Sequence, residues 1–174
     1  MSLHASSWPA DPALMLAAAE EAVAHFKGLG DKRGAAGALH LAAAVQYASF
    51  ARKGEPKEAR KAAEAAVAFY RGLEDAEGQA AVLRTVIHAS LGKGLLDEAL
   101  RAAKDLLGLQ EERGDRRAEA RALDAVASLH MAKDNARKAL KVAQEALAAA
   151  QEAGDAELEQ EVLRTLASVY FLRR

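Results

Sequence analysis

The sequence has 174 residues, of which 51% are hydrophobic and 28% charged, a balance typical of a folded protein rather than a disordered chain. Lysine plus arginine number 24 against 25 for aspartate plus glutamate, so the net charge of -1 creates no long-range attraction for nucleic acid or an anionic membrane. No segment approaches the roughly 20 apolar residues of a membrane-spanning helix, and the absence of cysteine favours a reducing compartment. We therefore expect a soluble protein, in the cytoplasm or another reducing compartment, without membrane insertion.

The chain reads from end to end as a succession of helices. Aromatic residues make up only 5% and there are three prolines, while long alanine-rich stretches favour helices and close packing between them. The sequence therefore predicts an all-α fold of about eight helices. In chain order they are expected over residues 13–29, 32–53, 56–72, 76–92, 95–112, 116–133, 135–152 and 156–172.

The first corner, GLGDKRGAAGAL at residues 28–39, has four glycines ahead of a helical run, as a phosphate-binding loop would. The stretch recurs along the chain with its aspartate but without its full set of glycines, at spacings of 44, 40 and 40 residues. The recurring residues are Asp31, Asp75, Asp115 and Asp155. Aspartate before a helical run is a good N-cap, and a phosphate loop would follow a strand, of which there is no sign. We interpret the stretch as a structural corner and expect no nucleotide cofactor.

The second helix of each repeating unit recurs as well. Ala59, Ala99 and Ala139 align at intervals of 40 residues, and small residues four apart leave a narrow face that neighbouring backbones can approach closely. Each unit is therefore expected to be a helical hairpin, and the whole chain, 1–174, a single solenoid domain. The expected hairpins lie at about 31–74, 75–114 and 115–154, with half-repeats at 12–30 and 155–174.

Paired helices, a period near 40 residues and a G-x-x-x-E-A turn, seen from Gly54 to Ala59 and from Gly94 to Ala99, resemble the tetratricopeptide repeat (TPR) in its long-helix variant. The resemblance covers essentially the whole chain. It implies an α-solenoid, a right-handed superhelix with first helices on the concave wall and second helices on the convex back. It also implies binding of a protein or peptide rather than catalysis.

One face of the first helices is expected to point into the concave groove, next to the core stripe. Its residues follow helical spacings of four and three. The candidate partner-binding residues on this face are His40, Tyr47, Arg84, His88, Asp124, Ser128, Met131 and Arg164. The alternative is an ordinary solvated surface that happens to carry two histidines.

Catalysis is not expected, although this face carries serine, histidine and aspartate. Equivalent positions on successive repeats stand about 10 Å apart, whereas a nucleophile and its base need about 3 Å. The five histidines lack any metal-ligand spacing, so we expect no catalytic residue, metal or cofactor. Basic residues gather at 57–61 and 133–141, but without interleaved aromatics they do not indicate nucleic-acid binding.

The ends of the chain are expected to be uncapped. In the last helix the core stripe predicted by the repeat holds Leu163, Leu166 and Ala167, and part of the apolar surface has no partner there. We expect Leu166, Tyr170 and Phe171 to anchor another chain or a continuation of the solenoid, as in a homo-oligomer or a larger complex. The predicted function is a protein interaction module, an adaptor or scaffold acting through the groove or the ends. The alternative is a structural linker subunit of a large assembly.

Overall fold

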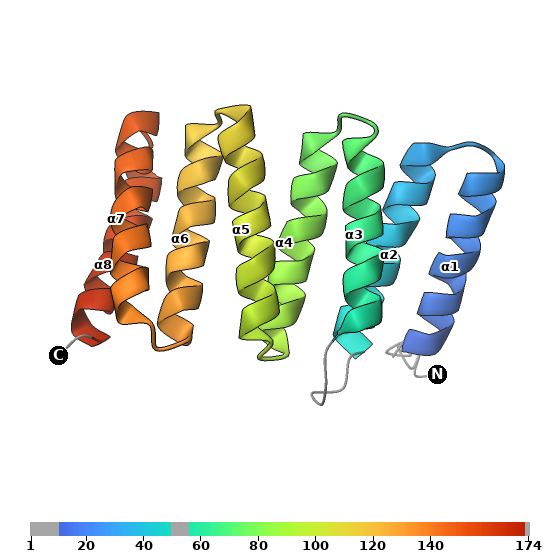
Figure 1. The fold of residues 1–174 in the computed structure, drawn as a ribbon, viewed down its shortest axis with the longest axis horizontal. Helices are drawn as coiled ribbons and strands as arrows, with labels where there is room; N and C mark the ends of the chain where they lie inside the picture. Colours follow the sequence, from blue (N-terminus) through green and yellow to red (C-terminus); the bar gives the residue numbers. More distant parts are fainter. Residues whose placement is uncertain (1–10, 50–55, 173–174) are drawn as a thin grey trace, which may run out of the picture. The chain divides into compact units, whose positions relative to one another are not determined.

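The structure, a computed structural model, describes residues 11–49 and 56–172 of the chain (Figure 1). Over these residues the chain forms eight α-helices and no strand, which confirms the predicted all-α fold. The helices are α1 Pro12–Gly28, α2 Lys32–Ser49, α3 Lys57–Arg71, α4 Ala76–Gly92, α5 Leu96–Arg113, α6 Arg116–Ala132, α7 Ala136–Ala153 and α8 Ala156–Leu172. Their bounds differ from the predicted ones by at most one residue, while the predicted end of α2 at residue 53 lies outside the described residues.

The helices group into two compact units, Met1–Asp75 with α1 to α3 and Ala76–Arg174 with α4 to α8. In unit 1, α2 packs against both α1 and α3. In unit 2, each helix packs against the next along the chain, and α6 also contacts α8. Successive helices run in opposite directions, so each unit is a stack of antiparallel hairpins (Figure 1). The chain is an all-α solenoid in which α2, α4, α6 and α8 are first helices of hairpins and α1, α3, α5 and α7 are second helices.

The corners between hairpins are built by local backbone chemistry. The carboxylates of Asp31, Asp115 and Asp155 each accept a hydrogen bond from a backbone N–H in the first turn of the next helix, at 2.9 to 3.1 Å. These bonds confirm three of the four predicted N-caps. The residue before each of the four repeating aspartates, Asp75 included, has a left-handed backbone, with φ of 71° at Gly30 and 56° at Glu74. Glycine adopts this conformation without steric cost, so Gly30 of the first corner serves the turn.

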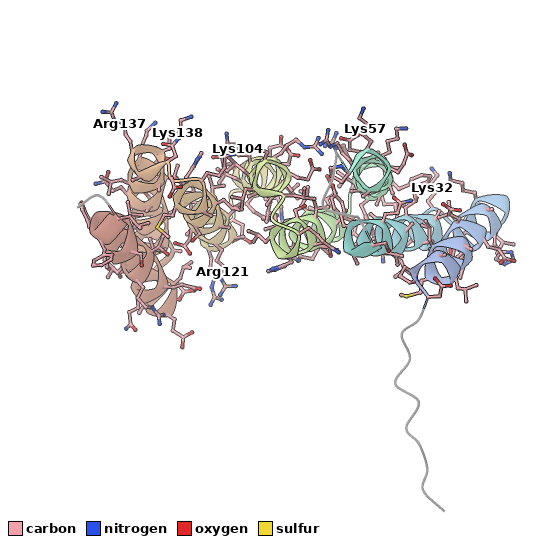
Figure 2. All side chains as sticks on the ribbon, turned by 90° about the horizontal axis from the view of Figure 1, so that it is seen from below. Lys32, Lys57, Lys104, Arg121, Arg137 and Lys138 are labelled. Atoms are coloured by element: carbon pink, nitrogen blue, oxygen red, sulfur yellow. The ribbon has the colours of Figure 1, made fainter. Side chains whose placement is uncertain are left out.

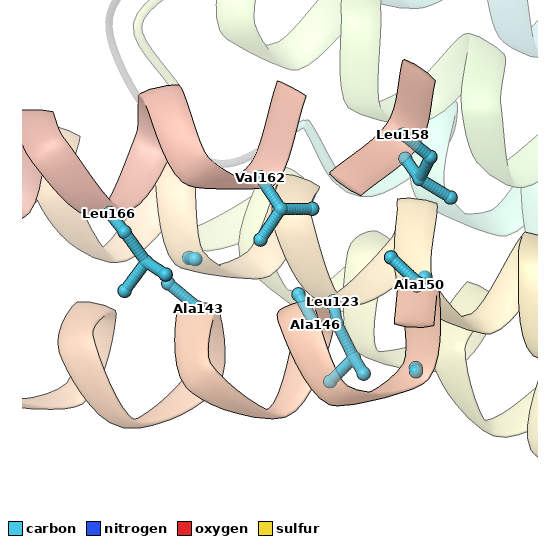
Figure 3. Close-up of a cluster of buried hydrophobic side chains, with 10 residues drawn as sticks. Leu123, Ala143, Ala146, Ala150, Leu158, Val162 and Leu166 are labelled. Atoms are coloured by element: carbon cyan, nitrogen blue, oxygen red, sulfur yellow. The ribbon is translucent and has the colours of Figure 1, made fainter. Parts of the chain in front are cut away.

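Small side chains let the helices approach one another closely. The alanines aligned on the second helices are completely buried at Ala99, Ala103, Ala139 and Ala143, as expected from the repeat. In unit 2, Ala143 belongs to a cluster of buried side chains contributed by α6, α7 and α8 (Figure 3). Alanine buries only a methyl group, so this core gains its stability from many close contacts rather than from a few large side chains.

The last helix departs from the predicted core stripe. Its buried residues are Leu158, Val162, Leu166 and Val169, at spacings of four, four and three, and the first three belong to the cluster with α7 (Figure 3). Leu163 is 46% exposed and Ala167 is also exposed, so the prediction that both join the core is wrong. The reason is that α8 packs only against α7 and α6 within the described chain, and the side carrying Leu163 meets neither.

Candidate partner-binding surface

A cavity of about 460 Å³ lies in unit 2 among α4, α5 and α6. Four arginines from these three helices line it, namely Arg84, Arg113, Arg117 and Arg121. Leu106, Ala118 and Ala122 add apolar surface, and Glu77 and Asp115 are the two carboxylates. We call this site the arginine cavity. Its lining carries two more positive than negative charges.

The arginines are held in place by ion pairs that leave donors available. Glu77 accepts from Arg84 Nη2 at 2.7 Å and from Arg113 Nη1 at 3.4 Å. The hydrogen bond from Arg84 is the main cause that lowers the pKa of Glu77 below its usual value. Arg117 donates from Nε to the carboxylate of Asp155. A guanidinium has five N–H donors, so each of these arginines can bind a further acceptor.

Each arginine is positioned by an ordinary feature of the hairpins. Arg113 is in the last turn of α5, where a positive charge favours the negative end of the helix. It also donates to the amide oxygen of the buried Gln110 at 3.3 Å. Arg117 and Arg121 are four residues apart on α6 and therefore lie on one face of that helix. Figure 2 shows Arg121 on the opposite side of unit 2 from Lys104, Arg137 and Lys138.

The chemistry of the cavity suits carboxylate groups. Guanidinium groups form paired hydrogen bonds with carboxylates, and a shared positive field strengthens each bond. The apolar lining accommodates the carbon stems of glutamate or aspartate side chains. The lining of the cavity is therefore chemically suited to carboxylate groups and opposes cations.

The structure divides the predicted groove residues between the two units. In unit 1, His40 is half-buried, and burial lowers its pKa. Tyr47 is completely buried, so the expectation of an exposed tyrosine at this position is wrong. Tyr47 lies one turn after the buried Ala43 on the same stripe of α2, which explains why it faces the core.

In unit 2, Arg84, His88 and Arg164 are exposed, as a partner-binding residue must be. Arg164 donates from Nε to the backbone oxygen of Gln160 at 3.3 Å. The other predicted residues are half-buried, namely Asp124, Ser128 and Met131. Burial is the main cause that raises the pKa of Asp124, and its Oδ1 atom has no hydrogen-bond partner. Of the predicted groove residues, only Arg84 lines the arginine cavity.

At the C-terminal end the predicted anchors behave differently from one another. Leu166 is buried against α7 and is 7% exposed, so the prediction that it presents an open apolar surface is wrong. Tyr170 and Phe171 are 53% and 76% exposed. The open apolar surface of α8 is therefore formed by Tyr170 and Phe171 together with Leu163.

Sequence reasoning missed three of the four cavity arginines. Their signal is the stretch RGDRRAEAR at residues 113–121, which has four arginines in nine residues across the corner between α5 and α6. Because this stretch also matches the repeating corner, its sequence alone predicts only a turn between two helices. Bringing Arg84 beside it required α4 to pack against α5, which the sequence does not specify directly.

No group of three or more histidine, aspartate or glutamate residues in the described part of the chain could hold a metal ion. Within residues 11–49 and 56–172, none of the helices combines the length and the hydrophobicity that crossing a membrane requires.

No protein family description and no curated protein sequence matches the chain. Solved structures do match. BtubC from P. vanneervenii superposes with a TM-score of 0.61 at 16% identity, over 92% of this chain and 66% of that one, so this chain spans slightly less than two thirds of its length. A putative kinesin light chain of Podosopora anserina with nearly identical TPR-like repeats gives a TM-score of 0.53 at 16% identity, over 93% of this chain and 87% of that one. In fold, the chain is a TPR-type helical repeat protein.

Proposed function

We propose that this protein is an interaction module that binds an acidic segment of a partner protein at the arginine cavity. The observation that supports the proposal most is the convergence of four arginines from three helices on one cavity. Paired surface charges contribute little to folding, so the ion pairs of these arginines with Glu77 and Asp155 have little value for stability. The arginines gain much more from a carboxylate ligand that completes their hydrogen bonds.

A titration with a labelled glutamate-rich peptide tests the proposal. The double variant Arg84→Gln, Arg121→Gln removes two guanidinium groups from the cavity. Each charge-assisted hydrogen bond contributes about 1.5–3 kcal/mol, so the affinity should fall by about tenfold or more. The matched control is Arg137→Gln, Lys138→Gln, which removes the same charge from the opposite side of unit 2. This control should bind nearly as tightly as the unchanged protein.

The salt dependence of binding and a variant of two predicted groove residues provide two further tests. Salt should weaken the binding of the glutamate-rich peptide, because screening reduces attraction between exposed charges. The variant Arg84→Ala, His88→Ala should also bind more weakly, with helicity and melting temperature nearly unchanged, since both side chains are exposed. Equal affinities of the cavity variant and the control would show that the arginine cavity does not bind acidic segments.

The second candidate function is that of a structural subunit built permanently into a larger assembly. The exposed apolar side chains of Leu163, Tyr170 and Phe171 favour it, because such patches on α8 are typical of interfaces. This function predicts that the end of the solenoid, and not the arginine cavity, determines which proteins are found with it. Cross-linking in the native complex followed by identification of the linked residues would distinguish the two candidates.

A further inference from the structure

The side of α8 that faces away from α7 carries an open apolar stripe. It comprises Gln160, Leu163, Ala167 and Tyr170, at spacings of three, four and three residues, and all four are exposed. We call it the α8 outer face. Leu163 and Tyr170 are its large apolar side chains, 46% and 53% exposed, and Gln160 is a polar residue at its N-terminal edge.

The same stripe is buried in the other first helices of unit 2. Forty residues earlier, α6 carries Ala120, Leu123, Ala127 and His130, which are at most 6% exposed. Leu123 and Ala127 belong to a cluster with alanines of α7, the second helix of that hairpin. The α8 outer face is therefore the surface on which the second helix of a hairpin packs. Within the described residues no such helix covers it.

Helix α1 has the complementary property, because it is a second helix with no first helix before it among the described residues. It matches α7 at an offset of 124 residues, with N-caps at Asp11 and Asn135 and left-handed glycines at Gly30 and Gly154. In this register Met15 of α1 corresponds to Ala139 of α7.

Along this register, α1 is exposed at two positions that α7 buries and half-buried at Ala22, whereas Ala19 is buried like its equivalent Ala143. Met15 is 39% exposed, whereas Ala139 is completely buried. His25 is exposed, whereas its equivalent Ala149 is 4% exposed. The stripe on α1 consists of Met15, Ala18, Ala22 and His25, again at spacings of three, four and three, and we call it the α1 outer face.

We propose that the α8 outer face of one copy binds the α1 outer face of a second copy and so completes a helical hairpin between two chains. The side chains are complementary in size, because Leu163 and Tyr170 on α8 meet a stripe with alanines at its centre. The contact joins two different surfaces, so it repeats head to tail and produces open chains or closed rings of copies.

Charge supports the same pairing. In an antiparallel hairpin the first turn of one helix lies beside the last turn of the other. The first turn of α8 is acidic, with Glu157 and Glu159, and the last turn of α1 is basic, with His25 and Lys27. The hairpin of α4 and α5 has the same arrangement, where Glu77 pairs with Arg113 at 3.4 Å. Glu157 occupies the position in α8 that Glu77 occupies in α4.

This association goes beyond the proposed function, because it uses none of the arginines of the cavity. The two proposals can therefore fail separately. The variant Arg84→Gln, Arg121→Gln should associate like the unchanged protein, and variants of the outer faces should still bind the glutamate-rich peptide.

Analytical ultracentrifugation of the 174-residue chain over a wide concentration range tests the proposal. We expect association that grows with concentration. Leu163→Glu, Tyr170→Lys blocks the α8 outer face, and Met15→Lys, Ala22→Glu blocks the α1 outer face. Each variant alone should associate at least about tenfold more weakly, as when a central contact of an interface is lost.

An equimolar mixture of the two blocked variants gives the decisive result. One variant retains an intact α1 outer face and the other an intact α8 outer face, so the mixture should form a one-to-one dimer and no larger species. Ser168→Lys and Ala24→Lys are the controls, because both change an exposed residue off the stripes. They should associate like the unchanged chain, and circular dichroism should show unchanged helicity in all variants.

Three results would overturn the proposal. One is an unchanged chain that stays monomeric at every concentration, as it would if the face is covered only by a different protein or by further helices of a longer chain. Another is a variant with a blocked α1 outer face that still associates, which would indicate contact between two α8 helices. The third is a mixture of blocked variants that remains monomeric.

Discussion

One helix crossing in unit 1 and the equivalent crossing in unit 2 are packed by side chains of opposite size. In unit 1, Phe26 of α1 lies against Gly34 of α2, where an added Cβ would lie 2.4 Å from the ring. At the equivalent positions of unit 2, Ala150 of α7 and Leu158 of α8 belong to one buried cluster (Figure 3). The large residue is on the second helix at this crossing of unit 1 and on the first helix at this crossing of unit 2, whereas the crossing of α5 and α6 has Gln110 on the second helix and Ala118 on the first.

This comparison shows that the crossing of two helices in the repeat constrains combined volume more strongly than residue identity. A core tolerates hydrophobic exchange when its total volume is kept, but it resists a change at one position alone. A consensus with one residue per repeat position does not show that the combined volume is kept. Gly34 and Leu158 occupy the same repeat position and differ greatly in size, so the consensus treats them as incompatible. The predictions below test the relation from the largest expected effect to the smallest.

Removing the large residue of unit 2 should have the greatest effect. Leu158 is 2% exposed, so Leu158→Ala leaves a cavity in the cluster and should reduce the free energy of unfolding by about 2–5 kcal/mol. Urea denaturation measures the loss. The same change at the exposed Leu163 should cost much less, and equal losses at the two positions would contradict the packing of α8.

Adding volume to unit 1 should come next. Gly34→Ala brings a methyl group into the ring of Phe26 and should cost about 1–3 kcal/mol through overpacking. In a Phe26→Ala background the same change should cost less, because the ring is gone and only the contact of the added Cβ with Asp31 Oδ2 at 2.6 Å remains. Thermal unfolding of the four proteins of this double-mutant cycle measures the coupling. An effect of Gly34→Ala that is equal in both backgrounds would refute the volume relation.

The corners provide a comparison within unit 2. Gly114 has a φ of 65°, so Gly114→Ala should destabilise the protein by about 1–2 kcal/mol. Gly108 lies inside α5 with open space around its Cα, and Gly108→Ala should stabilise it by about 1 kcal/mol. Melting temperatures that shift in the same direction for both would show that the corner does not depend on a left-handed backbone.

The smallest effect concerns one histidine in each unit. Burial lowers the pKa of His40 in unit 1 and of His130 in unit 2, where Lys104, Lys138 and Lys133 lower it further. The unfolded chain binds protons at these histidines near pH 6.5, whereas the folded protein binds them only at lower pH. The contribution of the two neutral histidines to stability is therefore fully present above pH 6.5 and is lost as the pH falls below it. His130→Gln should reduce this loss, as measured by melting temperatures from pH 8 to pH 5. A loss identical to that of the unchanged protein would contradict this contribution of His130.

The sequence by itself determined the helices, their corners and the repeat. These features depend on local chemistry, because a capping aspartate, a left-handed glycine and a helical spacing act within a few residues of the chain. Asp115 is an example, since it caps α6 as its position in the sequence predicts. The repeat spacing then identified the TPR-type fold, although no protein family description matches.

Only the tertiary structure decided which faces are covered. Periodicity places Tyr47 on a stripe with Ala43, but the packing of α2 between α1 and α3 determines that this stripe is buried. Likewise Leu163 and Leu166 lie close together on α8, and the side on which α7 packs selects Leu166 for the core. The arginine cavity is lined by residues of three helices, so Arg84 and Arg121 line the same cavity only after folding. The physical reason is that burial depends on neighbours distant in sequence, whereas helix formation depends mainly on residues within one turn.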